Sequence, residues 1–402
     1  MTTGAHRSAA DVVVVGAGVM GAWTALQAQR EGWRTTLIDA FGAGNSRATS
    51  GDETRIIRSS HGADAFYTRW SREALEAWLA FGAETGERLF VPAGALWLAR
   101  TDDGFEAASE STMRAQGIPV DRLSAAELGA RWPQLAAEDL AFAVFEPEAG
   151  LLMARRGVAA VARQFAAEGG RAELAWAGPG QRTGGRLEAV VTSDGTRHLA
   201  DQYVFAAGPW LPRLFPDVTA DLIRVTKQDV ILVGSPAGDG RFGADRLPCW
   251  VDYAAAFYGI PDVEGRGMKL GPDRYGPVFD PSHGERIVDP ESVRLARRYL
   301  ARRFPDLADA PVVETRVCQY ETTPDGHFVI DRHPELDNVW LVGGGSGHGF
   351  KHGPLIGQHV VRRLAGASLA PGEERFGLGH ARAPQATLRT GADAMVEGWA
   401  DW

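Results

Sequence analysis

The N-terminal part of the chain alternates between short apolar runs and stretches with helical periodicity. The apolar run Val12–Val15 leads into a glycine-rich turn and a stretch of helix formers. A second strand-like run, Thr35–Asp39, follows and ends on an acidic residue. A strand, a turn, a helix and a second strand in this order are typical of a βαβ unit. The pattern therefore predicts an α/β fold that begins with a parallel sheet.

The turn itself carries the pattern Gly16-x-Gly18-x-x-Gly21. In a dinucleotide-binding fold, the first glycine permits the tight turn, the second lets the backbone approach a pyrophosphate, and the third allows close helix packing. The helix N-terminus would supply N–H groups to the phosphates. Asp39 is placed to accept a hydrogen bond from a ribose hydroxyl. The alternative is a tight turn in an unrelated α/β domain.

The rest of the chain continues with further helices and strands. Helices are expected at 66–81, at two places within 109–137 (the second after a Ser124–Glu127 capping box), at 153–169 and at 290–303. Strands are expected around a turn at 87–99, as an antiparallel meander at 171–200, at 201–210 and across 222–281. Residues 338–351 repeat the order of strand and glycine-rich turn, and a helix follows them.

Composition excludes several classes of function. The 402 residues carry a net charge of −9 without a basic block, which argues against nucleic-acid binding. The sequence lacks an apolar stretch of about 18 residues that would predict a membrane span. The first ten residues lack the apolar core of a signal peptide, and the two cysteines do not suggest a disulfide framework. A cytoplasmic protein is expected.

The second glycine-rich turn bears on the kind of dinucleotide. A nicotinamide dehydrogenase normally joins two contiguous halves of one nucleotide-binding fold. Here the turn at 343–349 lies far along the chain from Gly16. Such a turn could bring backbone N–H groups to a second part of a larger cofactor. The spacing favours a flavin and leaves a nicotinamide as the alternative.

Five ordered motifs resemble those of the monomeric sarcosine oxidase family, which also contains N-methyltryptophan oxidase and pipecolate oxidase. The family is a branch of the D-amino-acid-oxidase-like flavoproteins. The similarity runs from about residue 11 to about residue 380, and its motifs are the glycine turn at 16–21, the segment 52–58, Gly267-Met-Lys269-Leu-Gly271, Cys318-Gln-Tyr320 and Ser346-Gly-His-Gly-Phe-Lys351.

The resemblance implies an FAD-binding Rossmann-like domain with an inserted β-rich substrate domain, an α/β (α+β) fold. The FAD domain would comprise 10–84, 151–218 and 321–384, and the substrate domain 85–150 and 219–320. Residues 385–402 would form a C-terminal tail. Gly16, Gly18, Gly21, Asp39, Thr54, Arg55, Gly345, Gly347, Gly349, Phe350 and Lys351 would contact the cofactor.

Two residues stand where the family has chemistry on the flavin. Cys318 resembles the residue that anchors the flavin covalently, and Arg316, two positions before it on a strand, could favour its thiolate. The alternative for Cys318 is an inert buried thiol, the interpretation that we keep for Cys249. Lys269 matches the lysine associated with the reaction of reduced flavin with oxygen. The alternative for Lys269 is a solvated loop residue.

Other residues would bind the substrate. Arg55 and Arg58 are three apart and would share one face of a helical turn. By resemblance, Arg58 and Lys351 would bind a substrate carboxylate, and Arg55 would support the flavin region. Tyr258 lies where the family carries an active-site tyrosine. For Tyr258, and equally for Tyr320, the alternative is ordinary core packing.

The chain also departs from the family at the substrate pocket. Asp273 replaces a histidine found in members that act on sarcosine, and Ser50 and Gly51 replace histidines before the arginine segment. His61 stands where the family often has another aromatic residue, while His348 and His352 are interpreted as held by the backbone rather than as bases. The pocket is therefore expected to accept a different amine, and the resemblance leaves that amine open.

The resemblance implies oxidation of a secondary or primary amine of an amino acid to an imine, with oxygen as acceptor and hydrogen peroxide as product. The partners would be the amino-acid amine and oxygen, the protein would be a monomer, and no metal would be needed. One alternative is an FAD-dependent dehydrogenase that passes electrons to a carrier, against which Lys269 argues. Another is a non-catalytic flavin-binding protein, which would not need Arg58, Lys351 and Lys269 together.

Overall fold

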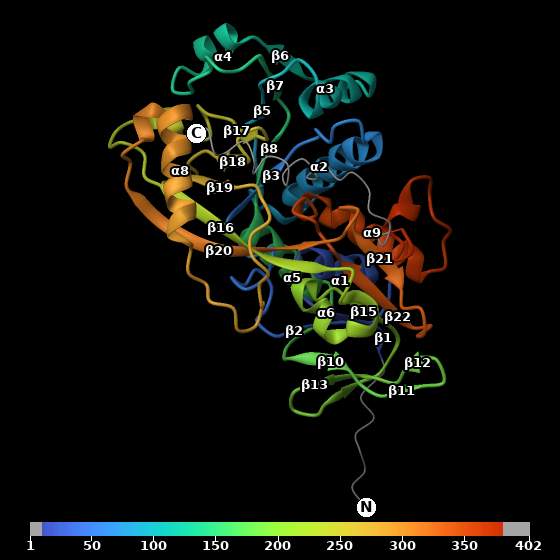
Figure 1. The fold of residues 1–402 in the computed structure, drawn as a ribbon. Coiled ribbons are helices and arrows are strands. Elements are labelled where there is room, and N and C mark those ends of the chain that lie inside the picture. The colour runs from blue at the N-terminus through green and yellow to red at the C-terminus, as the bar shows by residue number, and fades with distance from the viewer. Residues whose placement is uncertain (1–9, 381–402) are drawn as a thin grey trace, which may run out of the picture. The chain divides into compact units, whose positions relative to one another are not determined.

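The computed structural model describes residues 10–380, which form two compact units built from interleaved segments (Figure 1). The first unit takes residues 10–51, 154–224 and 321–380, and the second takes 52–153 and 225–320. The predicted assignment of a cofactor domain and a substrate domain to such segments stays a prediction. The predicted C-terminal tail, 385–402, lies outside the described residues.

The first unit is a sheet with helices packed against it. Its strands are β1 (Ala10–Val15), β2 (Thr35–Asp39), β9 (Arg171–Leu174), β10 (Ala177–Pro179), β11 (Arg182–Thr183), β12 (Arg186–Leu187), β13 (Val190–Thr192), β14 (Arg197–His198), β15 (Ala200–Phe205), β21 (Val329–Arg332) and β22 (Val339–Gly343). Its helices are α1 (Val19–Arg30), α5 (Ala154–Ala167), α6 (Leu211–Leu214), α7 (Pro216–Thr219) and α9 (Gly353–Leu364), with 3₁₀ turns η1 (Gly208–Trp210), η4 (Phe350–His352) and η5 (Glu373–Phe376).

The main sheet of this unit has the strand order β21-β22-β15-β1-β2-β9 among the described residues. From β22 to β9 neighbouring strands are parallel, and β21 is antiparallel to β22. The βαβ prediction is confirmed, and β2 has the predicted bounds. Strands β1, β15 and β22 come from three distant parts of the chain, and their carboxyl ends meet at one edge. Ligands of such sheets bind at that edge.

One part of the sequence prediction for this unit is wrong. We predicted that 171–200 forms an antiparallel meander throughout, but its first strand, β9, pairs parallel with β2 in the main sheet. The remainder does form small antiparallel pairs, β10-β13-β14 and β11-β12. Helix α5, which packs against α1, precedes β9, and the pairing of β9 with the distant β2 is a contact that the local turn signals do not report.

The second unit is built on a larger, mixed sheet. Its strands are β3 (Thr54–Ile57), β4 (Phe90–Val91), β5 (Ala95–Ala99), β6 (Asp121–Leu123), β7 (Phe142–Glu146), β8 (Gly150–Met153), β16 (Arg224–Val233), β17 (Cys249–Asp252), β18 (Phe257–Ile260), β19 (Met268–Pro272) and β20 (Val312–Thr322). Its helices are α2 (Ala65–Thr85), α3 (Phe105–Ala115), α4 (Ala125–Arg131) and α8 (Pro290–Arg303), with 3₁₀ turns η2 (Gly240–Phe242) and η3 (Pro305–Leu307).

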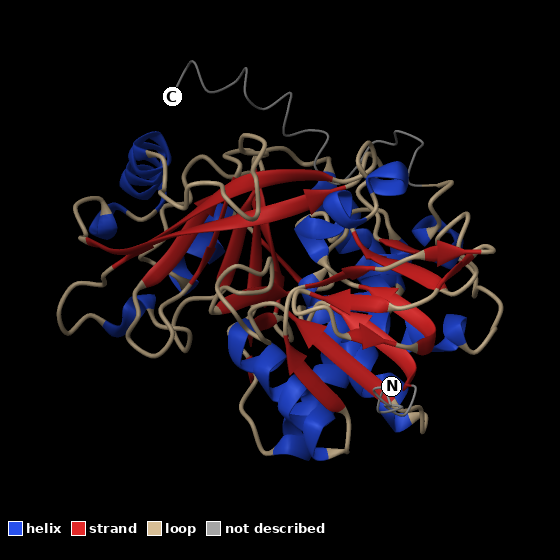
Figure 2. Cartoon of the chain, turned by 90° about the horizontal axis from the view of Figure 1, so that it is seen from below, coloured by secondary structure: helices blue, strands red, loops and turns tan. Residues whose placement is uncertain are grey.

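These helices match the sequence pattern closely. Helix α2 covers the predicted 66–81, α5 lies within the predicted 153–169, and α8 has the predicted bounds. The capping box before α4 is present, because Ser124 and Glu127 each bond the other's backbone. Figure 2 shows helices (blue) lying against the strands (red) of the molecule. Among residues 10–380, every helix is too short or too polar to cross a membrane.

The large sheet has the order β20-β16-β19-β18-β17-β5-β7-β6 in the described chain, and its two faces differ. On one face Leu96, Trp250 and Leu270 pack with Leu295 and Leu300 of α8 in the main core of this unit. Alternate residues of a strand point to the opposite face. That opposite face carries the row Trp97–Val251–Tyr258–Gly271 of directly paired residues, together with Lys269.

Candidate functional site

In the first unit, the glycine-rich turn after β1 lies too close to neighbouring backbone to leave room for side chains. Gly16 has a φ of +106°, and a Cβ on it would lie 2.4 Å from the carbonyl oxygen of Ala206, just after β15. A Cβ on Gly21 would lie 1.9 Å from the carbonyl oxygen of Gly16. The predicted roles of Gly16 in the turn and of Gly21 in close helix packing are therefore confirmed. The role of Gly18 at a pyrophosphate stays a prediction.

The carboxylate of Asp39 holds this turn by binding backbone N–H groups. Its carboxylate accepts hydrogen bonds from the N–H groups of Ala17 and Phe41, each at 2.7 Å. Burial raises the pKa of Asp39, although these hydrogen bonds oppose the shift. A carboxylate has about four acceptor positions, so these two bonds leave room for a ribose hydroxyl. The predicted bond from Asp39 to that hydroxyl stays a prediction.

The second glycine-rich turn, after β22, packs on the first helix. A Cβ on Gly349 would lie 2.9 Å from the terminal methyl of Met20 in α1, and Gly353 and Gly357 of α9 are equally tight against Trp23. Gly344 and Gly347 have positive φ angles of +66° and +73°. Lys351 is buried, and its ammonium donates to the carbonyl of His348 at 3.1 Å. The predicted flavin contacts of Gly345, Gly347, Gly349, Phe350 and Lys351 stay predictions.

This edge of the first unit fits a dinucleotide. Gly16 and Gly21 pack closely just after β1, and Gly349 lies in the turn after β22, so glycine backbone lines the edge at which such sheets bind ligands. The N-terminus of α1 also lies here, and the N–H of Val19 is 3.3 Å from the hydroxyl of Ser50. Phosphate groups of a bound FAD would lie at the N-terminus of α1, the positive end of its dipole.

In the second unit, the buried carboxylate of Asp52 binds two of the predicted cations, Lys269 and Arg55. Asp52 is 6% exposed and accepts from the ammonium of Lys269 and, at 2.7 Å, from the guanidinium of Arg55. Arg316 lies 3.7 Å from its second oxygen. Burial alone would raise the pKa of Asp52, but the charges of Lys269 and Arg55 outweigh it and lower that pKa. Asp52 therefore stays ionised.

Lys269 is held on the opposite face of the sheet from α8. It is 4% exposed and donates to Asp52 and, at 3.0 Å, to the carbonyl of Thr54. Its nitrogen lies 5.9 Å from the centre of the Tyr258 ring. Burial lowers the pKa of Lys269, while Asp52 opposes that shift. A solvated loop lysine is excluded, because Lys269 lies within β19 and is buried.

The geometry corrects two expectations about the arginines. Arg55 and Arg58 do not share a helical turn, since Thr54–Ile57 is a strand, β3, paired with β8. The β-branched isoleucines between them favour a strand, in which residues three apart point to opposite faces. The cation beside Cys318 is also Arg55 rather than Arg316, because a nitrogen of Arg55 lies 3.3 Å from the Cys318 sulfur.

Arg316 instead pairs with acidic residues. It contacts Glu53 at 3.1 Å and forms a close ion pair with Glu314. The two cysteines differ as expected from their positions: Cys318 is partly exposed, whereas Cys249 is buried, and burial raises the pKa of the Cys249 thiol to about 12. Tyr320, two residues after Cys318, has its hydroxyl 3.5 Å from a carboxylate oxygen of Asp273. Asp273 is thereby placed beside this cluster.

Arg58 lies against Trp97. Its guanidinium carbon is 4.8 Å from the centre of the Trp97 ring, a cation–π contact, and it donates to the carbonyl of Ser60. Since Trp97 belongs to the same paired row as Tyr258, Arg58 lies over the sheet face that carries Lys269. The structure describes Lys351 in the other unit, so a joint role of Arg58 and Lys351 stays a prediction.

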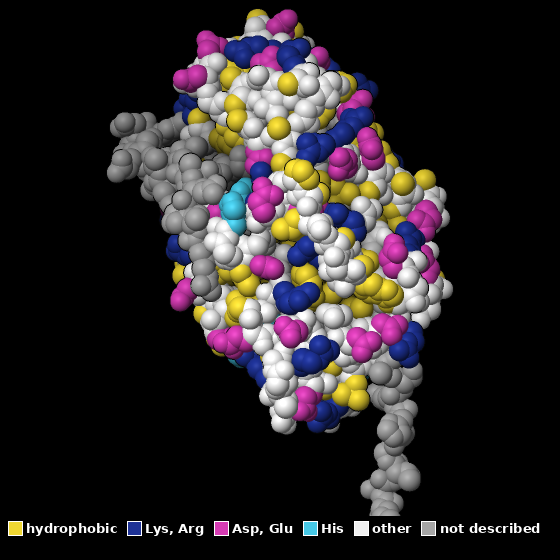
Figure 3. Space-filling model, turned by 90° about the vertical axis from the view of Figure 1, so that its right-hand side faces the viewer, with side chains coloured by type: hydrophobic (Ala, Val, Ile, Leu, Met, Phe, Trp, Pro, Cys, Tyr) yellow, Lys and Arg dark blue, Asp and Glu magenta, His cyan; other side chains and the backbone are white. Residues whose placement is uncertain are grey.

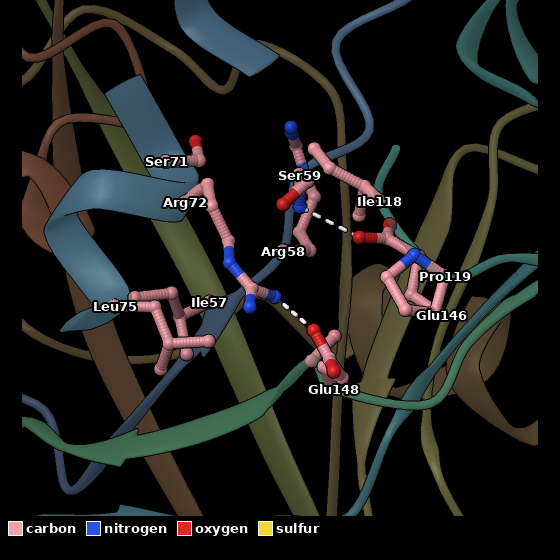
Figure 4. Close-up of a pocket in the computed structure, with 11 residues that line it drawn as sticks. Ile57, Arg58, Ser59, Ser71, Arg72, Leu75, Ile118, Pro119, Glu146 and Glu148 are labelled. Atoms are coloured by element: carbon pink, nitrogen blue, oxygen red, sulfur yellow. Dashed lines mark hydrogen bonds and ion pairs between the residues drawn. The ribbon is translucent and has the colours of Figure 1, made fainter. Parts of the chain in front are cut away.

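Glu146 is a residue that the sequence analysis missed. Its buried carboxylate accepts from the backbone N–H of Ser59 at 2.6 Å, that of Ser60 at 3.2 Å and the indole of Trp97 at 3.0 Å, and also from the Ser60 hydroxyl. Figure 4 shows Glu146 bonded to Ser59 beside a small pocket. With only about 10 Å³ of free space, that pocket has room for about one water. Glu146 therefore fixes the turn that carries Arg58.

A family model described as FAD dependent oxidoreductase matches residues 11–363. The chain belongs to this family. It is 30% identical over 369 residues to a monomeric sarcosine oxidase from Bacillus sp. (strain B-0618), a match that covers 88% of this chain and 92% of that relative. It is 27% identical to an N-methyl-L-tryptophan oxidase from Salmonella arizonae, with 87% and 92% covered. The predicted resemblance to the sarcosine oxidase and N-methyltryptophan oxidase family is confirmed.

Two solved structures share the fold. A fructosyl peptide oxidase from E. terrenum superposes with a TM-score of 0.79 at 24% identity, over 94% of this chain and 96% of that one. An L-proline dehydrogenase from P. horikoshii superposes with a TM-score of 0.81 at 20% identity, over 92% and 97%. The α/β fold class and the FAD cofactor are thus confirmed. The fold alone does not decide the electron acceptor, because both an oxidase and a dehydrogenase have it.

The network around Glu146 gives a first prediction. In Glu146→Gln, an amide NH₂ would face N–H donors that now bond a carboxylate oxygen, so at least one buried donor loses its partner. We expect the free energy of unfolding to fall by about 2 kcal/mol. Urea unfolding followed by tryptophan fluorescence measures the change.

The matched control is Glu148→Gln in the same pocket. Glu148 is 45% exposed and pairs with Arg72, so its change should stay within about 0.5 kcal/mol. Equal stabilities of the two variants would show that Glu146 does not fix this turn.

Proposed function

We propose that this protein is an oxidase of amino-acid amines. It oxidises the secondary or primary amine of an amino acid to an imine, which water hydrolyses to a carbonyl compound and an amine, and it passes the electrons to oxygen to give hydrogen peroxide. The observation that carries the proposal is the buried ammonium of Lys269, held by Asp52 in a chain of the FAD dependent oxidoreductase family. The sarcosine and N-methyl-L-tryptophan oxidases similar to it act on such amines by name.

The bound FAD would supply the two-electron acceptor for the hydride equivalent of the substrate. The glycine turns around Gly16 and Gly349 would hold it. Arg58 and Lys351 would bind the substrate carboxylate, the first through a planar guanidinium and the second as a point charge. Tyr258 and Asp273 would shape the pocket for the rest of the substrate, and Asp273 would select among amino-acid side chains.

Lys269 would serve the reaction with oxygen. Two of the three N–H donors of an ammonium are directed to Asp52 and Thr54. The third remains for a ligand, since the described residues provide no further partner. A fixed cation in a water-poor site stabilises the negative charge that develops on oxygen as it takes up an electron.

Cys318 would link the flavin covalently. A nitrogen of the Arg55 guanidinium lies 3.3 Å from the sulfur, so a cation stands beside the atom that would attack the flavin. The new bond between sulfur and the 8α carbon replaces the S–H bond and one C–H bond of that methyl group. The two electrons released pass through the flavin to oxygen. The proposal further includes a monomer that acts in the cytoplasm.

The distribution of charge agrees with the proposed small-molecule partners. On the face drawn in Figure 3, basic side chains are interspersed with acidic ones, so a basic track for nucleic acid is not seen on that face. The chain's net charge of −9 points in the same direction.

Substrate binding is tested by Arg58→Ala. Loss of the guanidinium leaves the substrate carboxylate under-paired, at a cost of about 2–5 kcal/mol. The substrate concentration for half-maximal anaerobic flavin reduction should rise about tenfold or more, and Arg58→Lys should recover only part of the loss. Arg72→Ala, which removes a half-exposed ion pair with Glu148, is the control and should leave it unchanged. A best substrate without a carboxylate, unaffected by Arg58→Ala, would contradict the assignment.

The covalent link is tested by acid precipitation. Yellow colour should stay with the wild-type protein and with Cys249→Ser, since the Cys249 thiol is buried. Cys318→Ser should release it into the supernatant. Arg55→Met should slow the attachment of added FAD because the thiolate loses its neighbouring cation. Wild-type protein that releases all of its colour is the outcome that rejects the link.

Electron transfer to oxygen is tested by Lys269→Met, which removes the cation at similar volume. Reoxidation of the reduced flavin should slow by about a thousandfold, equivalent to about 4 kcal/mol, whereas reduction by substrate should change far less. Lys269→Arg should restore part of the rate.

Lys227→Met, which removes another lysine paired with an aspartate on the same sheet, is the control for this experiment. It should change neither half-reaction. If Lys269→Met slows both half-reactions equally, Lys269 is structural and the dehydrogenase alternative regains its place.

A further inference from the structure

A buried carboxyl group in the first unit has no role in the proposal above. Glu321 is 5% exposed, and its Oε2 atom has no hydrogen-bond partner among the described residues. The backbone N–H of Gly345 bonds to the carboxyl group. An unsatisfied buried acceptor or donor costs about 1–3 kcal/mol, so its persistence calls for a partner that binds there.

Glycines surround this carboxyl group. A Cβ on Gly208, whose φ is +51°, would lie 3.1 Å from Oε2, and a Cβ on Gly345 would lie 3.5 Å from Oε1. Gly208 follows β15 and Gly345 follows β22, which are neighbours in the parallel sheet. The carboxyl group therefore lies at the carboxyl ends of these strands, the edge at which such sheets bind ligands. The backbone of Glu321 is fixed there too, because its carbonyl accepts from Ser346 at 2.9 Å.

The ionisation state of Glu321 follows from these surroundings. Burial raises the pKa of Glu321 to about 8, and the bond from Gly345 opposes the shift only in part. The segments after β15 and β22 contact it with glycines, and Met20 of α1 lies beside Gly345. No charged or titratable side chain of the described residues offsets the burial. At neutral pH the group is thus a carboxylic acid, which can donate as well as accept.

We propose that Glu321 is a cofactor-binding residue that donates a hydrogen bond from Oε2 to an oxygen of the bound FAD. The oxygens that FAD could present to this edge are phosphate, hydroxyl and carbonyl oxygens, which accept hydrogen bonds. A carboxylate would repel them, whereas a carboxylic acid can donate to them. Bound FAD supplies the partner that Oε2 lacks. The proposal rests on the family's cofactor and not on the proposed amine substrate.

The test uses the visible absorption of the flavin bound to the full-length protein, recorded between pH 6 and pH 10. Ionisation of Glu321 beside the bound cofactor should change the wild-type flavin spectrum with one titration above pH 8, because the hydrogen bond to FAD stabilises the protonated form and adds to the effect of burial. Glu321→Gln keeps the shape and a donor but cannot ionise, so its flavin should stay bound and this titration should disappear. Persistence of the titration in Glu321→Gln would overturn the proposal.

Glu106→Gln is the matched control. Glu106 is a glutamate of the other unit whose pKa burial also raises, to about 7. Its replacement should leave the flavin titration as in the wild type, and a loss of the titration in Glu106→Gln instead would reject Glu321 as its source.

Affinity provides a readout independent of titration. In a Cys318→Ser background, FAD binding is reversible and its dissociation constant can be measured by fluorescence. Glu321→Leu removes the donor at similar volume and should weaken FAD binding about tenfold or more at pH 7, whereas Glu321→Gln should bind within about threefold of the background. If Glu321→Leu binds FAD as tightly as Glu321→Gln, the hydrogen bond does not exist. Should Glu321→Leu not fold, the titration of Glu321→Gln still decides.

Discussion

The ion cluster at Asp52 is the constraint on which the chemistry of the second unit depends. A lysine and an arginine side chain would not remain together in a buried place without a negative charge between them, and a buried carboxylate would not remain ionised without them. Asp52 joins Lys269 on β19 to Arg55 on β3, and Arg55 reaches Cys318 on β20. One carboxylate thus places both the proposed oxygen-activating cation and the cation beside the proposed flavin anchor.

The first unit depends on a different constraint, the close approach of backbones at one sheet edge. Gly16, Gly21 and Gly349 each lie where a methyl group would meet a neighbouring residue. The result is an edge of closely packed backbone beside the N-terminus of α1, which suits phosphates, with the carboxyl group of Glu321 set into it. In the proposed function, the first unit would hold the cofactor through its backbone and the second would supply buried charge for the reaction.

Much of this could be predicted from local sequence, because glycine turns, capping boxes and 3.6-residue periodicity are local signals. The glycine turn at Gly16 and helices such as α2 and α8 were found in this way. Contacts between distant segments leave weaker signals. Because the two isoleucines favour a strand, the segment that carries the arginines forms β3 rather than a helical turn. Arg55 therefore contacts Cys318, whereas Arg58 lies against Trp97. Glu146 lies about 90 residues from the serines it holds, and no local pattern marks it.

The central claim is that this FAD-dependent enzyme takes electrons from an amino-acid amine and gives them to oxygen. The most direct test mixes the purified yellow protein without oxygen with a panel of secondary and primary amino-acid amines, and follows the flavin absorption before and after air is admitted. The account predicts that at least one amine bleaches the flavin, and that air restores the colour with one hydrogen peroxide formed for each flavin reoxidised. A flavin that an amine bleaches but that air does not recolour, or one that no amino-acid amine bleaches, would contradict it.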